Sequence, residues 1–348
     1  MRNIYLIRHG QPAFPDGKHM CIGSTDLPLS KLGHLQAALA GAEFSNRQIT
    51  LFSSPLLRAR QTAEAFGMPY TVLDGFRELY MGQWDGLTFD EIRSQFPDLY
   101  ADRATDKTLP FPDSEDPEEG LDRFLNAIRR ALSMCTGDIA IVTHSGVMEL
   151  LLQSSEKAPY GSYTHIVENQ GSLSVCSFGI VPHPSLDETL CYRLLDAAQA
   201  PENVISHCRC VAEKAAELAY PLLEAGYPLD MRLIETGALL HDIARTEDLH
   251  AQRGAWYLEK LGYYDVAKVI QSHCDYSSTA LNEEAIVFLA DKLTLGTTCV
   301  TIQERFSKSR RKCRTEEEIG YHRARHTAAL ELLEVYNHIV RREQLTEV

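Results

Sequence analysis

The stretch NIYLIRHGQP, residues 3–12, is a short apolar run that ends abruptly in polar residues. Asn3 to Ile7 have the composition of a buried strand, and Arg8, His9 and Gly10 follow where that strand must end. In an open α/β sheet, ligands bind in the crevice beyond the carboxyl ends of the strands. A glycine at this point allows a sharp turn and a close approach of a ligand. The stretch therefore predicts a binding site at the mouth of a sheet.

The residue types at this strand end suit phosphate chemistry. Neutral imidazole attacks phosphorus without first losing a proton, so His9 is a candidate nucleophile. The guanidinium of Arg8 offers a planar fork that matches two phosphate oxygens. Taken alone, however, the three residues also fit an ordinary surface or core histidine. The rest of the chain must decide between these interpretations.

The first half of the chain alternates between strand-like and helical patterns. Strands are expected at 3–7, 49–53, 70–73, 138–143 and 173–178, and helices at 31–43, 57–66, 89–96, 116–134 and 147–153. Ser30 is the expected N-cap of the first helix. Alternation of this kind predicts an α/β domain with a mostly parallel sheet.

The pattern changes near residue 183. After Pro184 no strand is expected, and helices are expected at 187–200, 204–219, 232–242, 251–261, 264–272, 283–294 and 322–341. The sequence thus predicts two domains, an α/β domain over 1–182 and an all-α domain over 183–348.

Composition narrows the classes of partner. The formal net charge of −14 is shared equally by the two halves, so neither offers the basic face that a nucleic-acid polymer requires. Local arginines can still build a positive pocket for a small phosphorylated metabolite or a nucleotide. No apolar run reaches the roughly 18 residues of a membrane span, and nine scattered cysteines suit a reducing compartment. A cytoplasmic location is expected, and the oligomeric state is not indicated.

Three further strand ends carry polar residues of the same kind. Arg58 follows the second strand at the start of a helix, and Glu78 lies in a loop after the third. AIVTHSG, residues 140–146, repeats the order of strand, histidine and glycine at His144 and Gly146. Four strand ends thus bring two histidines, two arginines and a carboxyl group toward one rim of the predicted sheet.

These motifs resemble those of the histidine phosphatase (phosphoglycerate-mutase-like) superfamily over residues 1–180. The matching segments are RHG (8–10), GSTDLPLSKLGHLQA (23–37), SSPLLRARQTA (53–63), RELYMGQWDG (77–86), PFPDSE (110–115) and VTHSGV (142–147). The segment YMGQWDGLTFDEI (80–92) looks like that of the small phosphatases related to α-ribazole phosphatase, which favours phosphomonoester hydrolysis over mutase activity.

The resemblance implies a role for each residue and requires no metal in this domain. His9 is the implied nucleophile that becomes phosphohistidine, and Glu78 protonates the leaving oxygen. The residues expected to hold the transferring phosphoryl group are Arg8, Arg58 and His144, and Gly10 and Gln11 are expected to contact the substrate.

Polar residues in the second half sit among apolar neighbours. His241 and Asp242 follow an apolar helical run, as does Asp291. A carboxylate buried in such surroundings needs a cation or a metal. The histidines 207, 241, 250 and 273, with the two aspartates, would meet this demand.

This set, with the segments ALLHDIAR (238–245) and FLADKL (288–293), resembles the HD-domain superfamily of metal-dependent phosphohydrolases over about 200–300. The resemblance implies a core metal site of His207, His241, Asp242 and Asp291, and His250 and His273 as the further ligands of two-metal members. Manganese, iron, nickel or zinc is expected, as one or two ions. Cys274 stands where many two-metal members have a second histidine, so a third ion is not expected. Lys292 is either a contact to substrate phosphate or a solvated lysine.

The leading hypothesis is a bifunctional phosphohydrolase. It joins a metal-free phosphomonoesterase to a metal-dependent hydrolase of a nucleotide-like phosphoester or anhydride. Two alternatives concern the second domain, which could instead be a di-iron oxygenase or a nucleotide-sensing regulator of the phosphatase.

Overall fold

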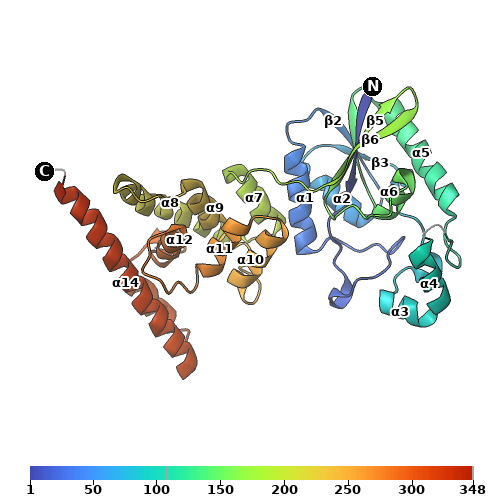
Figure 1. Ribbon diagram of the computed structural model, residues 1–348. Helices are drawn as coiled ribbons and strands as arrows, with labels where there is room; N and C mark the ends of the chain where they lie inside the picture. The colour runs from blue at the N-terminus through green and yellow to red at the C-terminus, as the bar shows by residue number, and fades with distance from the viewer. Residues whose placement is uncertain (107–108, 347–348) are drawn as a thin grey trace. The chain divides into compact units, whose positions relative to one another are not determined.

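The computed structural model describes residues 1–106 and 109–346. The chain divides into two compact units, Met1–Pro184 and Ser185–Val348. Figure 1 shows strands and helices in the first unit and mainly helices in the second.

A six-stranded sheet in the order β3-β2-β4-β1-β5-β6 forms the centre of the first unit. Parallel pairs join β1 to β4, β4 to β2 and β2 to β3, whereas β5 pairs antiparallel with β1 and β6. The strands are β1 (Arg2–Arg8), β2 (Ile49–Ser53), β3 (Tyr70–Val72), β4 (Asp138–Thr143), β5 (Tyr163–Asn169) and β6 (Ser172–Ile180). The predicted α/β fold with a mostly parallel sheet is confirmed.

Both faces of this sheet are covered by helices (Figure 1). Tyr5 and Ile7 of β1 belong to a core cluster shared with α1 (Lys31–Glu43) and α2 (Leu57–Glu64). Ile4 and Leu6 belong to the opposite cluster, shared with α5 (Pro117–Met134) and α6 (Ser145–Leu152). Because successive side chains of a strand point to opposite faces, an apolar run such as YLI fits a strand buried on both sides.

The predicted elements agree closely with the observed ones. Ser30 caps α1 as expected, because its side chain accepts a hydrogen bond from Gly33 N. Not predicted were β5, α4 (Pro97–Thr105) and three short 3₁₀ turns, η1 (Pro15–Gly17), η2 (Asp74–Phe76) and η3 (Gly82–Trp84). The helix α3 (Phe89–Gln95) was expected.

The second unit is helical, as predicted, apart from one ribbon of two-residue strands. Its helices are α7 (Glu188–Ala197), α8 (Glu202–Glu224), α9 (Met231–Leu240), α10 (His250–Lys260), α11 (Tyr264–Ser272), α12 (Glu283–Lys292), α13 (Ile302–Arg310) and α14 (Glu316–Thr346). The ribbon, β7 (Thr294–Leu295) with β8 (Thr298–Cys299), and α13 were not predicted. Among the described residues, none of the helices combines the length and apolarity needed to cross a membrane.

Buried apolar positions explain how this unit packs. Along α8 the buried residues recur every three or four positions, for example Val204, Cys208 and Val211. The last eight residues of α12, Ala285–Lys292, are all buried, including Asp291 and Lys292. The helix α12 packs against α8 and α9, so its two charged residues lie inside the helical unit.

Gly10 is required by a close approach between the end of β1 and the start of α1. A Cβ atom at Gly10 would lie 2.2 Å from the carbonyl oxygen of Gly33. We expect Gly10→Ala to lower the free energy of unfolding of the first unit by roughly 1–3 kcal/mol, because backbone must shift to relieve the overlap. Urea unfolding measures this change. Gly137→Ala is the control, because a Cβ there meets no heavy atom within 4 Å; equal stability of the two variants would contradict the prediction.

Candidate active sites

The first cluster forms where β1, β2 and β4 end. The ring centroids of His9 and His144 are 5.0 Å apart, and Nε of Arg58 lies 3.3 Å from Nε2 of His9. All three side chains are buried. The structure therefore brings together three residues that lie far apart in the sequence.

The ring of His9 is oriented by its own backbone neighbour. Nδ1 lies 2.7 Å from the carbonyl oxygen of Gly10. Because a carbonyl only accepts hydrogen bonds, Nδ1 carries the proton and Nε2 keeps its lone pair. Burial, with the nearby cations Arg58 and Arg8, holds the pKa of His9 well below its usual range. The imidazole is therefore neutral at neutral pH, the form that a nucleophile needs.

The two arginines are held by backbone carbonyls and an aromatic ring. Arg58 donates from Nη1 to Thr25 O (2.9 Å) and from Nη2 to Gly23 O (3.0 Å). Arg8 donates from Nη1 to Ala158 O (2.5 Å), and its guanidinium carbon lies 3.8 Å from the ring centroid of Tyr160. These contacts fix the positions of both guanidinium groups beside His9.

Two buried polar atoms of this cluster have no hydrogen-bond partner among the described residues, Nε of Arg8 and Nδ1 of His144. Buried polar groups are normally paired, so orphaned atoms beside a histidine and two arginines indicate a place for an anionic ligand. The other ring nitrogen of His144, Nε2, shares a hydrogen bond of 2.7 Å with Oγ of Ser54.

Glu78 is held at the start of α6. Its carboxylate accepts hydrogen bonds from the backbone N–H groups of Gly146 (3.0 Å) and Val147 (3.1 Å) and from its own neighbour Leu79 (3.0 Å). A Cβ at Gly146 would lie 2.6 Å from Oε1 of Glu78, so a glycine is needed there. The side chain of Glu78 is buried and lies close enough to interact electrostatically with both arginines.

The two predicted substrate contacts lie at the same strand end. Gly10 N donates to Oγ1 of Thr62, and the carbonyl of Gln11 accepts from Ser30 at the start of α1. The sequence reasoning missed Ser54 and Tyr160. The signal for Ser54 was its position next to a strand end in SSPLLRARQTA, whereas nothing in the sequence marked Tyr160.

The second cluster lies inside the helical unit, and five elements contribute to it. His207 comes from α8, His241 and Asp242 follow α9, His250 begins α10, His273 follows α11, and Asp291 comes from α12. Their donor atoms form overlapping groups whose members lie within 4.8 Å of one another: His207, His241 and Asp291; His241, Asp242 and His273; and His250, His273 and Cys274. All six predicted ligands are thus brought together.

Three of the histidines are oriented in the same way. Nδ1 of each lies close to a backbone carbonyl oxygen: His207 to Gly296 (2.8 Å), His241 to Ala238 (2.7 Å) and His273 to Ile270 (2.6 Å). Such carbonyl bonds fix the ring and direct Nε2 toward the other side chains of the cluster, where a metal would bind. The ribbon β7–β8, which contains Gly296, therefore helps to position His207.

Charge in this cluster favours ionised carboxylates. Burial opposes ionisation of Asp291, but Lys292 and the hydrogen bond from His207 hold its pKa well below the usual range. Burial also opposes the charged form of His207, but Asp291, whose Oδ1 lies 3.2 Å from its Nε2, raises the His207 pKa. Burial and the neighbouring His241 lower the pKa of His273 to about 3.

Two atoms of the cluster, Nε2 of His241 and Oδ1 of Asp242, are buried without a hydrogen-bond partner among the described residues. Unpaired donor atoms of these types, converging with other imidazoles and carboxylates, fit a divalent transition metal. The residues present therefore suit the metal that the sequence predicts.

Three cations surround this cluster, and the sequence reasoning named only one of them. Lys292 is buried and donates to Asp291 (2.7 Å) and to the carbonyl of His273 (2.9 Å), so the alternative of a solvated lysine is wrong. Arg305 of α13 lies 3.3 Å from Oδ1 of Asp291, and Arg245 lies 3.1 Å from Nε2 of His250. Arg305 was missed because its helix was not predicted, and Arg245 because it follows the HD pair without a distinctive pattern.

The comparisons with known proteins agree with these two clusters. Residues 4–179 match the model of the histidine phosphatase superfamily (branch 1), which is half of the chain. The chain belongs to this superfamily. Residues 204–296 of the histidine phosphatase match the HD domain, so the second unit carries an HD domain. Both resemblances expected from the sequence are confirmed.

Two phosphatases are among the proteins similar to this chain. The 6-phosphofructo-2-kinase/fructose-2,6-bisphosphatase of Gallus gallus is 33% identical over 170 residues, 46% of this chain and 35% of that protein. The glucosyl-3-phosphoglycerate phosphatase of Mycolicibacterium vanbaalenii is 35% identical over 102 residues, 28% of this chain and 45% of that protein. The chain spans about a third of the first relative and less than half of the second.

Among solved structures, Bacillus stearothermophilus YhfR is 27% identical in sequence, with a TM-score of 0.49. The match covers 52% of this chain and 98% of the YhfR chain. Histidine phosphatases and HD domains are both families of phosphohydrolases that act on small phosphorylated substrates, and HD domains depend on metal.

Proposed function

We propose that this histidine phosphatase is a bifunctional phosphohydrolase. Its first unit hydrolyses a phosphomonoester of a small metabolite through a phosphohistidine at His9, and its HD domain hydrolyses a nucleotide-like phosphoester or anhydride with bound metal. In each unit, imidazoles that are fixed by backbone carbonyl groups lie beside buried polar atoms with no hydrogen-bond partner among the described residues. This observation carries the proposal.

In the first unit the reaction divides into two displacements. Nε2 of His9 attacks phosphorus and forms the N–P bond as the P–O bond to the alcohol breaks, and Glu78 gives the leaving oxygen a proton. Water then attacks the phosphohistidine and gives a proton back to Glu78, the N–P bond breaks, and phosphate leaves neutral His9. Arg8, Arg58 and His144 would bind the equatorial oxygens, where negative charge is spread in the transition state.

The residues around His9 and the names of the similar proteins both support small phosphate esters as the substrate class. Two of the similar proteins are named for fructose-2,6-bisphosphate and glucosyl-3-phosphoglycerate, which are different phosphorylated small molecules. Gly10 and Gln11 follow His9 in the chain, and the Tyr160 ring centroid lies 5.8 Å from that of His9. They are the groups that we expect to meet the alcohol portion of the substrate.

In the HD domain, His207, His241, Asp242 and Asp291 would hold one ion, and His250 and His273 would contribute to a second. A bound manganese, iron, nickel or zinc ion supplies an activated water and neutralises phosphate charge. Lys292, Arg245 and Arg305 place three further positive charges around the carboxylates. A cluster this rich in cations suits a substrate that carries more than one phosphate, such as a nucleotide.

The test is a panel of sugar phosphates, nucleotides and dinucleotides, assayed with and without EDTA. We expect one activity that resists EDTA and one that EDTA abolishes and added metal restores. A single activity, wholly resistant or wholly sensitive, would overturn the bifunctional proposal. Consumption of O₂ would instead support an oxygenase, and a change in phosphatase rate with intact nucleotide would support a sensor.

Glu78→Gln tests the proton donor. The variant keeps the size of the side chain and cannot donate a carboxylic proton, so we expect the EDTA-resistant rate to fall by about 10²–10⁴-fold for alkyl phosphates. The loss should be much smaller for p-nitrophenyl phosphate, whose leaving group needs no proton. Equal losses on both substrates would indicate that Glu78 only positions α6. Glu64→Gln, on α2, is the matched control.

The low pKa of His9 predicts that its ring takes up a proton at a lower pH than the ring of an ordinary histidine. Because the pKa is depressed, the neutral ring should persist as the pH falls through 6.5, and protonation should appear only well below that value. NMR of isotope-labelled histidine rings, with the His9 signal assigned by its loss in His9→Gln, measures this. In Arg58→Leu one nearby cation is removed, so the His9 signal should titrate at higher pH. A His9 titration near 6.5 in the unsubstituted protein would contradict the prediction.

A further inference from the structure

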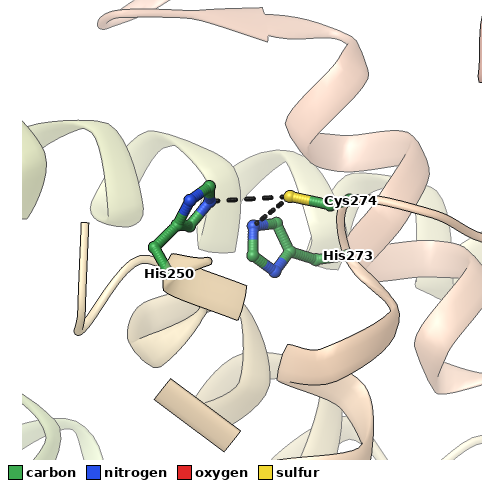
Figure 2. A group of neighbouring side chains, drawn as sticks. All are labelled: His250, His273 and Cys274. Atoms are coloured by element: carbon green, nitrogen blue, oxygen red, sulfur yellow. Dashed lines mark hydrogen bonds between the residues drawn. The ribbon is translucent and has the colours of Figure 1, made fainter. Parts of the chain in front are cut away.

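Cys274 lies beside two histidines of the metal cluster. Its Sγ is 3.3 Å from Nε2 of His273 and 3.5 Å from Nε2 of His250 (Figure 2). Figure 2 shows the sulfur and both rings converging on one space, although they come from the start of α10 and the end of α11. His250, His273 and Cys274 therefore form a group of three ligand atoms.

A carboxylate oxygen also lies beside these two imidazoles. Oδ1 of Asp242 lies 3.3 Å from Nε2 of His250 and 3.6 Å from Nε2 of His273. This oxygen is buried, the Asp242 residue is only 5% exposed, and no hydrogen bond satisfies Oδ1 among the described residues. Its closest polar neighbours are thus the nitrogens that would bind an ion, which indicates that the space is built for a cation.

The geometry points to Cys274 as a thiolate ligand of the second ion, together with His250, His273 and Asp242. This inference rests on the proposed metal-dependent function and deepens it. Two imidazoles, one thiolate and one carboxylate make four donors, the number that zinc prefers. On binding, the thiol proton passes to solvent. The ligand set therefore favours zinc at this position, because thiolate discriminates against manganese and magnesium.

The side chain of Arg245 must move before an ion can bind at this position. Its Nη1 lies 3.1 Å from Nε2 of His250, and its Nε lies 3.7 Å from Oδ2 of Asp242. Its side chain is half exposed, so it can swing into solvent when an ion replaces its contacts to His250 and Asp242. Cys274 and His250 are themselves only partly buried, which leaves the second position open to an incoming ion.

X-ray absorption at the zinc edge tests the inference on the full chain loaded with zinc. We expect a sulfur neighbour at about 2.3 Å beside nitrogen and oxygen neighbours at about 2.0–2.1 Å. Cys274→Ser should lose the sulfur signal and one of the two zinc ions, whereas Cys274→His should keep both ions and lose the sulfur signal. Cys210→Ser, one helical turn after His207 on α8, is the control and should change neither.

The outcomes separate this inference from the proposed function. A zinc-loaded protein that lacks the sulfur signal, or a Cys274→Ser variant that keeps it, overturns the role of Cys274. If metal-dependent hydrolysis is still present in either case, the proposed function stands. A sulfur signal without any metal-dependent hydrolysis would sustain the ligand and reject the activity. Failure to bind zinc at all would overturn the role of Cys274 and leave the proposed function to the test with EDTA and added manganese, iron or nickel.

Discussion

Replacement of His9 by alanine is expected to lower the EDTA-resistant phosphatase rate by about 10⁴-fold or more, because the nucleophile has no substitute in the pocket. Arg58 and Arg8 remain in His9→Ala, so a phosphate ester should still bind while its P–O bond stays intact. Steady-state hydrolysis of p-nitrophenyl phosphate in EDTA measures the loss. Acid-labile labelling of the protein by a ³²P-labelled substrate should appear in the unsubstituted chain and vanish in the variant.

The matched control for this experiment is His34→Ala, which removes an imidazole from α1 outside the cluster. Its rate should remain within a factor of a few of the original. The metal-dependent activity should be unchanged in both variants, because the second cluster uses no residue of the first unit. Phosphohistidine that persists in His9→Ala, or a loss of rate in His34→Ala as large as that in His9→Ala, would contradict the covalent mechanism.

Asp242→Ala is expected to lower the EDTA-sensitive rate by at least about 10²-fold. Loss of a residue that only orients a metal ligand already lowers activity by up to about 10²-fold, and loss of the ligand itself should lower it at least as much. The carboxylate of Asp242 has Nε2 of His241, His250 and His273 within 3.3–3.6 Å, so its loss affects both ion positions. Bound metal, measured by mass spectrometry of the desalted protein, should fall in the same variant. The EDTA-resistant rate should not change.

Asp248→Ala provides the control for this variant, because Asp248 is an exposed aspartate six residues further along the chain. It should retain full metal content and full activity. Thermal unfolding in the presence of EDTA shows whether Asp242→Ala remains folded. A folded Asp242→Ala protein with undiminished metal and activity would exclude the carboxylate as a ligand.

Local patterns explain why many elements were predicted at their true positions. The helix at Lys31–Glu43 begins after a serine that caps it, and the strands Ile49–Ser53 and Asp138–Thr143 are apolar enough to be buried on both faces. The strand β5 was missed because its buried residues, Thr164 and Ile166, alternate with the half-buried Tyr163, His165 and Val167, which does not give a clear apolar–polar pattern. A weak alternation of seven residues is easily overridden by tertiary pairing.

Tertiary structure was needed to find the groups that surround the predicted residues. Ser54, Tyr160 and Arg305 each contact predicted residues in the folded chain. Only Ser54 had a signal in the sequence, its position next to a strand end. Cys274 was visible in the sequence as a departure from the family pattern. Its distance to two imidazoles, which makes it a candidate ligand, exists only in the folded chain.

The sequence by itself determined the two domain types and named the candidate reactive side chains. Both are encoded locally, by the period of apolar residues and by motifs at the ends of strands and helices. Only the tertiary structure decided which atoms face one another: that Nε2 of His9 accepts a hydrogen bond from Arg58, and that a thiol lies beside His250 and His273. Such distances depend on how separate elements pack, and packing is set by contacts between residues far apart in the chain.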